Sequence, residues 1–450
     1  MKNIKIINYF MLIGMLVLST SCDDFLDKKP NLSLEIPESL DELEALMSAE
    51  NQINQGGVSD ILASDDFFHT EQALQTESNE QYVNTYLRNF IPEMYGDRIM
   101  PEWTIYYGKI YVANFCLQQI DNINRTQTNA SQFDRIKGNA FFLRAYAYSE
   151  LLKIFTPQYS EARLDESSIP LVLDTDINTI KDFAPLGLIY TQIFEDLDQA
   201  EILLPTIPEI RTRGSKSGVN ALKARVYLTM KAYDKALDAV EKSLAIDNQL
   251  IDFNTLNPGL NLPIVPVGNQ EIIFYYISGT YRLLSYNPEC RVNLDLYYNY
   301  DENDLRKRIY FFRNSAGNIN YKGHFTGRTN FFTGLSVSEN LLIKAECAAR
   351  LGDMEKAFDA LNELLSSRFS TEEFIPISAS EFNDPLGKIL LERRKELVFR
   401  GRRWSDLKRF LGERQEDFPL TRLLGDTLIE MDESPEAFVF PIPLEENTNR

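Results

Sequence analysis

Apolar side chains recur at helical spacing along much of the chain. Residues 101–120 and 133–155 place Trp, Tyr, Phe, Ile and Leu at steps of three and four, and the short link between these segments predicts an antiparallel helical hairpin. A third segment, 185–205, is framed by prolines that suit the start and the end of a helix. Ser39 and Glu42 have the spacing of a capping box before another apolar face. The pattern predicts a mainly α-helical protein.

Two later stretches share a pattern of small residues. Ala224 is followed twelve positions later by Ala236, and Ala345 is followed at the same interval by Ala357. A lysine precedes the second alanine in both stretches. Small residues at this interval let the two helices of a hairpin approach closely. The pattern resembles the tetratricopeptide repeat, in which helix pairs stack into a curved arc.

Helical periodicity is weak in residues 51–100 and 250–335. Gly, Pro and Asn interrupt both stretches, and the second is unusually rich in Tyr and Phe, with a short predicted strand at 271–277. Most of these rings are expected to pack a loop-rich subdomain onto the helices, and a few to line a ligand surface. The predicted fold is therefore a tetratricopeptide-like helical-hairpin arc that carries a loop-rich, aromatic-rich variable insertion.

The N-terminus has the three parts of a secretory signal peptide. A basic start, a short apolar run and small polar residues fill positions 1–21 and precede Cys22. We expect Cys22 to be the lipidated first residue of the mature chain, with acyl chains such as palmitate as its anchor. An ordinary cleaved signal, with Cys22 beside it by chance, is the alternative. Residues 22–37 are expected to form an acidic leader that begins with the lipidated cysteine, and residues 38–450 are expected to form a single domain.

Charge and cysteine content exclude several functions. The formal net charge is −20, and such a surface repels phosphate backbones, so nucleic acid is not an expected partner. The remaining cysteines, Cys116, Cys290 and Cys347, are far apart and show no metal-binding spacing. We expect them to be small buried hydrophobic residues, and no metal or cofactor is predicted.

A charged motif lies near the C-terminus. Asp384 suits the N-cap of a helix, and Gly401 suits the C-cap. Residues 391–409 read LERRKELVFRGRRWSDLKR, so a second short helix is expected around Trp404. The bases are interleaved with acids, which argues against nucleic acid. The Trp and Arg side chains are predicted to lock the two helices together.

This motif resembles the C-terminal signature of the SusD/RagB family of Bacteroidetes nutrient-uptake lipoproteins. Further segments match family elements in the right order, and these are 143–151, 169–172, 194–200, 304–306, 339–347 and 440–446. The acidic tract after Cys22, Asp-Asp-Phe-Leu-Asp, resembles the export tag of surface lipoproteins in these bacteria. Two positions depart from the family pattern: Arg400 replaces a usual Glu, and Ser405 replaces a usual aromatic residue.

The resemblance implies a location and a partner. It implies a lipid-anchored protein of the cell outer membrane that faces outside, binds a nutrient, and passes it to a SusC-like, TonB-dependent transporter. An oligosaccharide is the favoured ligand. A peptide is the alternative, because the two tryptophans, Trp103 and Trp404, both fall at structural positions and leave none for a sugar platform.

Aromatic residues beside charged ones are the candidate ligand contacts. Rings stack on the apolar faces of sugars, while carboxylates and guanidinium groups bind hydroxyls. The candidates are Asp65, Asp66, Phe67, Phe68, Tyr281, Arg282, Tyr286 and Arg291. Each is an interpretation of local sequence, since a single ring more often belongs to a core.

Two other functional classes are compatible with the sequence. An interaction scaffold would bind proteins through the helical arc alone. An enzyme is disfavoured, because no HExxH, GxSxG, Walker or GxGxxG motif occurs and the two histidines, His69 and His324, are far apart. A metal could be ligated by Asp65, Asp66, His69 and Glu71, although such a cluster is more often a solvated turn. A pair of carboxylates that hydrolyses a glycoside has no sequence signature, because the distance between the two groups is not visible in the sequence, so this activity stays open.

Overall fold

The structure is a computed structural model that describes residues 37–95, 101–279, 281, 284, 289–411, 413, 420–424, 427–444 and 446. The chain divides into two compact units, Met1–Glu38 and Ser39–Arg450. Only Pro37 and Glu38 of the first unit are described, so the predicted signal peptide and Cys22 lie outside the described residues. The described helices and strands all belong to the second unit.

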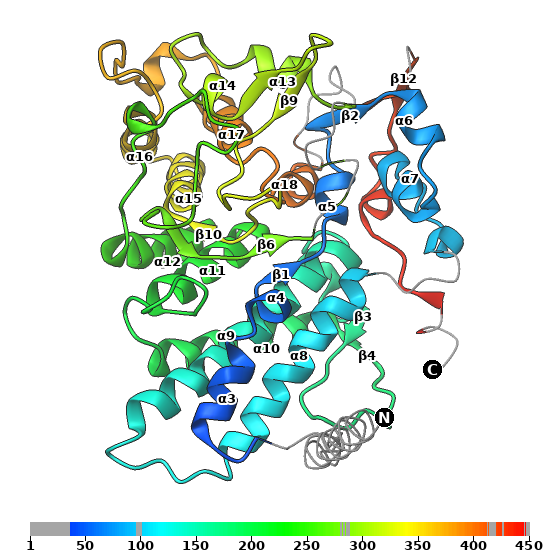
Figure 1. Cartoon of the computed structure of the whole chain (residues 1–450), viewed down its shortest axis with the longest axis vertical. Coiled ribbons are helices and arrows are strands. Elements are labelled where there is room, and N and C mark those ends of the chain that lie inside the picture. Colours follow the sequence, from blue (N-terminus) through cyan, green and yellow to red (C-terminus); the bar gives the residue numbers. More distant parts are fainter. Residues whose placement is uncertain are drawn as a thin grey trace, which may run out of the picture. The chain divides into compact units, whose positions relative to one another are not determined.

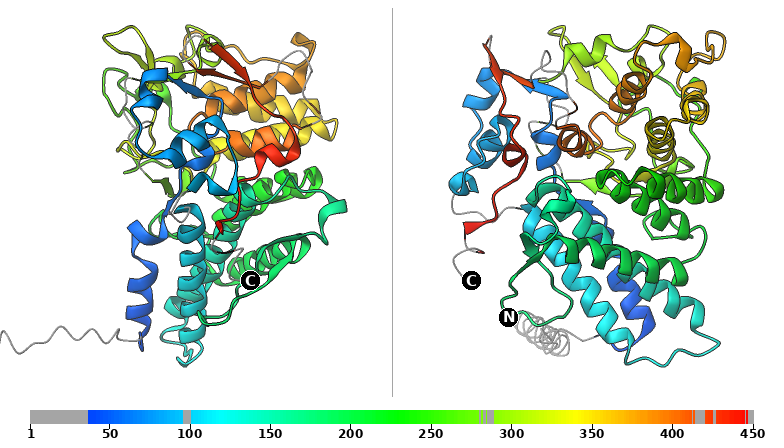
Figure 2. Two further views of the ribbon diagram at one scale, coloured as in Figure 1. Left: turned by 90° about the vertical axis from the view of Figure 1, so that its right-hand side faces the viewer. Right: turned by 180° about the vertical axis from the view of Figure 1, so that it is seen from behind.

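The larger part of the second unit is a layered stack of helices, here named the helical half. Its elements are α3 (Leu40–Met47), α8 (Pro101–Ile120), α9 (Ala130–Phe155), α10 (Leu186–Leu203), α11 (Lys216–Thr229), α12 (Tyr233–Ile246), α15 (Val337–Arg350), α16 (Met354–Ser366), α17 (Pro385–Glu396) and α18 (Arg403–Arg409), with the short hairpin β3 (Ser167–Pro170) and β4 (Phe183–Pro185). From α8 to α12 each helix packs on the next in the chain, and α15 then packs on α12, α16 and α17 (Figures 1 and 2). The mainly α-helical prediction is confirmed.

The predicted small residues lie where the helix pairs meet. Ala224 and Ala236 join α11 to α12, Ala345 and Ala357 join α15 to α16, and all four are fully buried. The two turns also share a geometry. Lys231 and Gly352 each stand two residues after the first helix and take a positive φ, 58° and 89°. The repeat expected from the sequence is therefore present as two helix pairs of the same construction.

The remaining elements form the loop-rich half. They are α4 (Glu50–Ile53), β1 (Gln55–Gly56), α5 (Ser59–Leu62), β2 (Phe67–His69), α6 (Glu71–Gln75), α7 (Glu80–Leu87), β5 (Ile272–Phe274), β6 (Ile277–Ser278), β7 (Cys290–Val292), α13 (Leu294–Tyr298), α14 (Arg306–Ile309), β8 (Phe311–Arg313), β9 (Ile319–Tyr321), β10 (Leu335–Ser336), β11 (Thr421–Leu424) and β12 (Thr427–Glu430). Each described strand pairs with one other, and β1–β6 is a parallel pair. The strand predicted at 271–277 is present as two separate short strands, because β5 pairs with β10 and β6 pairs with β1.

Long-range contacts build the core of the loop-rich half. The pairs β1–β6 and β2–β7 join the segment before α8 to the aromatic segment after α12. Phe67 and Tyr86 from the first segment share a core with Tyr310 and Phe331 from the second. The motif residue Phe399 completes this core and stacks on Phe331, with ring centroids 5.3 Å apart. Most rings of the predicted insertion therefore have a packing role.

Buried charges attach the loop-rich half to α17. Arg306 Nη2 lies 2.7 Å from Asp304 and 2.6 Å from Glu392. Arg368 Nη2 lies 2.9 Å from both Glu271 and Glu396. These side chains are fully buried, and together with Lys395 and Arg400 they are named here the buried charge cluster. Burial alone would raise the pKa of the Glu396 carboxyl, but Arg368 and Arg400 hold it well below its usual range.

The C-terminal motif adopts the two helices predicted for it. Asp384 accepts a hydrogen bond from the Gly387 N–H at 2.8 Å as N-cap of α17, and Gly401 turns the chain with φ +65°. Trp404 of α18 is fully buried and packs against Phe438, with ring centroids 5.2 Å apart. The motif therefore joins the last described segment of the chain to the helical half.

Candidate functional site

The ribbon of β2 and β7 brings two predicted ligand residues together. Successive side chains of a strand point to opposite faces. Phe67 and His69 are buried, while Phe68 between them is half exposed. On β7, Cys290 and Val292 are buried, and Arg291 is half exposed. Because Phe68 pairs with Arg291 in the antiparallel register, their side chains share the outward face.

Polar groups border this outward face. Thr70 Oγ1 donates a hydrogen bond to Glu289 Oε2 at 2.7 Å. The Arg291 guanidinium lies 3.8 Å from the same carboxylate, an ion-pair distance too long for a hydrogen bond. The Arg291 side chain is 33% exposed, and its Nε is buried without a hydrogen-bond acceptor among the described residues. Asn320 donates to the Cys290 carbonyl at 2.8 Å and fixes the ribbon from behind.

Two tyrosines lie close in sequence to β2 and β7. Tyr281 stacks on Tyr82 of α7, with ring centroids 3.3 Å apart and an interplanar angle of 23°. Tyr281 is mostly buried, and Tyr82 is half buried. Tyr281 and Glu289 flank the segment 282–288, in which only Leu284 is described. Because Tyr281 and Tyr82 belong to the core of the loop-rich half, only Phe68, Arg291 and Glu289 are named here the β2–β7 surface.

Asp65 and Asp66 are engaged by arginines of the C-terminal motif. Asp65 accepts two hydrogen bonds from Arg403, at 2.6 and 2.8 Å, and one from Arg394 at 3.2 Å. Against the effect of burial, Arg394 and Arg403 hold the pKa of the Asp65 carboxyl well below its usual range. Burial and the neighbouring Asp65 charge raise the pKa of Asp66 to about 6. These carboxylates anchor β2 to α17 and α18.

Phe67 lies in the core. Its side chain is 2% exposed and packs 5.7 Å from Phe399 and 5.8 Å from Tyr86, measured between ring centroids. The expectation that Asp65, Asp66 and Phe67 face a ligand does not agree with this burial, because their interactions are used within the fold. Arg282 and Tyr286 lie outside the described residues.

The residues considered for a metal site are held apart. The His69 N–H donates to the Tyr86 hydroxyl at 2.9 Å, and His69 Nδ1 faces the Glu289 carbonyl. In the part of the chain that the structure describes, no three His, Cys, Asp or Glu side chains gather as metal ligands. Cys116, Cys290 and Cys347 are buried free thiols, as predicted.

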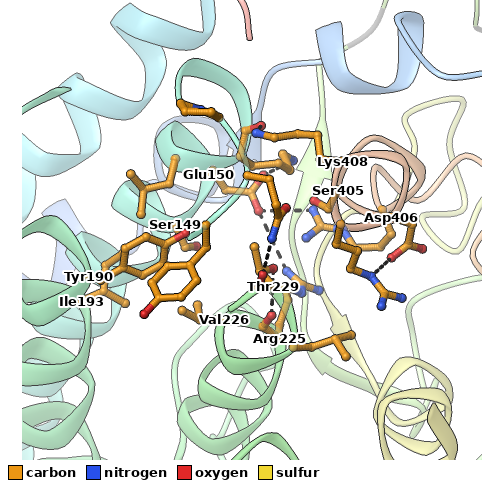
Figure 3. Close-up of a pocket in the computed structure, with 18 of the residues that line it drawn as sticks. Ser149, Glu150, Tyr190, Ile193, Arg225, Val226, Thr229, Ser405, Asp406 and Lys408 are labelled. Carbon is orange, nitrogen blue, oxygen red and sulfur yellow. Dashed lines mark hydrogen bonds and ion pairs between the residues drawn. The ribbon is translucent and has the colours of Figure 1, made fainter. Parts of the chain in front are cut away.

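A cavity in the helical half was not predicted from the sequence. A small cavity of about 50 Å³ lies where α9, α10 and α11 meet α18. Figure 3 shows Tyr190, Ile193 and Val226 on one side and Glu150, Ser405 and Lys408 on the other. The one sequence signal was Ser405, a small residue where the family motif usually has an aromatic one.

Arg400, the second departure from the family motif, has a packing role. Its guanidinium lies 3.7 Å above the centre of the Phe325 ring. It also donates to the hydroxyls of Ser336 and Ser338 at 3.3 and 3.2 Å. Arg400 therefore ties α17 to β10 and α15 and leaves the family interpretation unchanged.

Comparisons with known proteins agree with this architecture of helical repeats and a loop-built surface. A family model described as "Starch-binding associating with outer membrane" matches residues 24–228, and a model of the SusD family matches residues 305–438. The chain belongs to the SusD/RagB family. A SusD-like protein, P2, from Formosa agariphila is 25% identical over 375 residues, covering 68% of this chain and 70% of that protein.

Solved structures show the same fold. A SusD superfamily protein from Bacteroides thetaiotaomicron has a TM-score of 0.73 at 21% identity, over 91% of this chain and 98% of that one. A SusD-like carbohydrate binding protein from Bacteroides vulgatus has a TM-score of 0.69 at 18% identity, over 92% and 96%. Among the described residues, none of the helices combines the length and apolar character needed to cross a membrane.

Proposed function

We propose that this chain is a nutrient-binding lipoprotein of the outer membrane that holds its ligand at the β2–β7 surface. The observation that carries the proposal is the pairing of Phe68 with Arg291 on one outward face. A half-exposed ring beside a partly exposed guanidinium suits a sugar ring and its hydroxyls. The matched family model and the relative from B. vulgatus are described as starch-binding and carbohydrate binding, which supports an oligosaccharide as the ligand.

The ligand proposal is tested by calorimetry on the chain from residue 23 onward. This chain keeps the whole compact unit Ser39–Arg450. A panel of oligosaccharides and short peptides is titrated into the parent chain, Phe68→Ala and Arg291→Ala. Loss of a stacking ring or of a charged donor is expected to weaken binding by about tenfold or more in each variant.

Two matched variants control for unspecific effects. Phe115→Ala removes a half-buried ring from α8 in the helical half. Arg163→Ala removes an arginine whose side chain is 32% exposed, against 33% for Arg291. Both controls should bind like the parent chain. Equal affinity in all five proteins would place the ligand elsewhere, and no binding by the parent across the panel would contradict the proposal for the isolated chain and favour a protein-interaction scaffold.

The anchor and the location form the second part of the proposal. Lipidation at Cys22 would hold the protein at the membrane, and the acidic tract that follows would direct it to the outer face. Cells given an alkyne analogue of palmitate should label the parent chain, and they should not label Cys22→Ser. External protease should cleave the parent chain on intact cells. Labelling of Cys22→Ser, or protection from protease, would contradict this part.

The third part is delivery to a SusC-like, TonB-dependent transporter. A ligand held on an outward surface needs a second protein to carry it across the outer membrane, since a lipid anchor gives no path through it. Mild detergent extracts containing an affinity-tagged chain should yield a membrane barrel protein in near-stoichiometric amount. A tagged chain that purifies alone from such extracts, with its ligand present and absent, would contradict a stable partnership.

A further inference from the structure

Helix α8 carries no charge on its outward side. Its only two charged residues, Glu102 and Lys109, are both buried. Glu102 accepts hydrogen bonds from the Val58 and Ser59 N–H groups, and Lys109 donates to the Gln52 carbonyl. The outward side of α8 therefore consists of uncharged residues, in a chain whose net charge is −20.

Four residues make up this outward side and are named here the α8 face: Thr104, Gly108, Tyr111 and Phe115. They recur at steps of three and four, so they follow one line along the helix. Tyr111 is 41% exposed and stacks on the half-buried Phe115, with ring centroids 6.3 Å apart. A surface helix normally presents charged residues to water. An uncharged, aromatic side in so acidic a chain is typical of a surface that another protein covers.

Gly108 makes the centre of the α8 face flat. A Cβ atom added at this position would meet no neighbouring atom within 4 Å, so the described fold does not require a glycine there. A glycine inside an exposed helix weakens that helix relative to alanine. The missing side chain is an advantage where a second backbone or a ring approaches the helix closely.

A groove of about 320 Å³ runs beside the α8 face. Ile105, Gly108 and Val112 of α8 form one wall, and residues from the segment 51–55, three of them with amide side chains, form the other (Figure 1). A cavity of about 150 Å³ already holds a benzene molecule, so the groove has room for an aromatic ring. Its amides can form a hydrogen bond with a phenol hydroxyl.

The rings and the groove are complementary to each other. Gly108 belongs to both, and Tyr111 lies about one helical turn further along the same face. A two-fold axis between these two residues, with two α8 helices antiparallel, would place each Tyr111 ring at the groove of the other copy. Two copies that each carry a net charge of −20 repel one another. The α8 face adds no like charges to such a contact.

We propose that the α8 face and the groove beside it bind a second copy of this chain, in a two-fold symmetric contact centred on Gly108 and Tyr111. The contact lies on α8 of the helical half and shares no residue with the β2–β7 surface. It therefore does not depend on the function proposed for that surface.

Sedimentation equilibrium of the chain from residue 23 onward tests the proposal. The parent chain should form dimers as its concentration rises through the micromolar range. Gly108→Trp fills the centre of the α8 face, and Tyr111→Asp brings two like charges together across the axis. Each change should raise the dissociation constant of the dimer about tenfold or more. A parent chain that stays monomeric, or a dimer that both variants retain, would overturn the proposal.

Matched variants control for unspecific effects. Thr191→Trp and Tyr298→Asp make the same changes at exposed positions of α10 and α13 and should leave the dimer unchanged. Gly108→Trp should keep the fold, because the position faces open space. Circular dichroism spectra and urea midpoints like those of the parent chain check this. A control that weakens the dimer as much as its α8 counterpart would overturn the assignment to the α8 face.

Salt separates this contact from one made by opposite charges. Raising the salt concentration from about 0.01 to 0.15 M shortens the Debye length from about 30 to 8 Å and screens the repulsion between acidic copies. The dimer should therefore become tighter as salt is added. A dimer that weakens with salt would mean that ion pairs hold it, which would overturn the proposal.

Cross-linking tests the symmetry of the contact. Gly108→Cys lies near the axis in both copies, so a short bis-maleimide should join two such chains. Leu188→Cys places the thiol at an exposed position of α10 and should give only background cross-linking. Cys116, Cys290 and Cys347 are buried, so they should not react. Equal cross-linking of the two variants would overturn the two-fold arrangement.

Discussion

The helical half and the loop-rich half are held together in different ways. In the helical half, neighbours in the chain are neighbours in space, and fully buried alanines such as Ala345 and Ala357 set the contact between paired helices. In the loop-rich half, the pairs β1–β6, β2–β7 and β5–β10 join distant segments, while β8–β9 and β11–β12 are local hairpins. Its attachment to α17 relies on buried charges, including Arg306 and Arg368.

This difference determines how each half should respond to change. A stack of local helix pairs can lose one contact and keep the others. A core assembled from distant segments depends on a few connections, and a buried charge left without its partner is costly. We therefore expect substitutions in the loop-rich half and its charge cluster to have the larger effects.

Among single substitutions, Arg368→Ala is predicted to have one of the largest effects. The change leaves Glu271 and Glu396 buried without their shared partner, and breaking a buried ion pair costs about 3–5 kcal/mol of unfolding free energy. Urea denaturation followed by circular dichroism measures the loss. Lys242→Ala removes an exposed i,i+4 pair with Asp238 and should cost about 0.3–0.5 kcal/mol. Similar losses in the two variants would show that the buried charge cluster does not hold the halves together.

The next prediction separates two consecutive rings. Phe67→Ala opens a cavity in the core of the loop-rich half and should cost about 3–5 kcal/mol of unfolding free energy. Phe68→Ala removes a half-exposed ring and should cost about 1 kcal/mol or less, because most surface substitutions have small effects. The urea midpoints of the two variants give the comparison. A large loss for Phe68→Ala would mean that this ring also belongs to the core, which would weaken its role in ligand binding.

Phe67 and Phe68 also show which features of the fold could not be predicted from the sequence. The sequence predicts no strand within residues 51–100, and both Phe67 and Phe68 are candidate ligand contacts. The segment 67–69 is a strand, and alternation sends the two rings to opposite faces. The strand exists because it pairs with β7, more than 200 residues later in the sequence. No local pattern reveals such a partner. The helix pairs were predictable because periodicity and small residues report contacts between adjacent segments.

The candidate site was predictable to the same limited extent. Phe68 and Arg291 were selected because ring and guanidinium chemistry suits a sugar, and the register of β2 and β7 brings them together. Glu289, which belongs to the same surface, could not be predicted because nothing in its local sequence distinguishes it. The cavity at Ser405 was missed for a similar reason, since its walls come from five separate helices and a connecting segment.

Acid is predicted to weaken the loop-rich half at a higher pH than that at which most carboxylates titrate. Burial lowers the pKa values of His69 and His324, the only two histidines, from 6.5 to about 4 in the folded protein. Both are therefore neutral when folded, and the unfolded chain takes up their protons first. The stability from these groups is complete above pH 6.5 and is lost between pH 6.5 and 4, by about 1.4 kcal/mol for each pKa unit and each histidine.

Urea midpoints measured between pH 7.5 and 5 check this dependence. Asp66, whose pKa is raised to about 6, takes up its proton first in the folded protein and offsets part of the histidine effect within this window. Most other carboxylates matter only at lower pH, since the pKa of Glu150, for example, is lowered from 4.5 to about 2 in the folded protein. Its contribution is lost only below about pH 4.5. Replacing His69 and His324 with Gln should flatten the curve in this window. A double variant as acid-sensitive as the parent chain would assign the effect to other groups.

The smallest effect is predicted for overpacking the helical half. Ala345→Leu inserts a larger side chain where α15 meets α16 and should cost about 1–3 kcal/mol of unfolding free energy, because the helices can separate only slightly. Ala245→Leu makes the same change at an exposed position of α12 and should change stability by less than about 0.5 kcal/mol. Ligand binding at the β2–β7 surface should survive in both variants. A loss for Ala345→Leu as large as that for Arg368→Ala, or a loss of ligand binding, would mean that the two halves form one cooperative structure and that the local construction of the helix pairs gives them no independence.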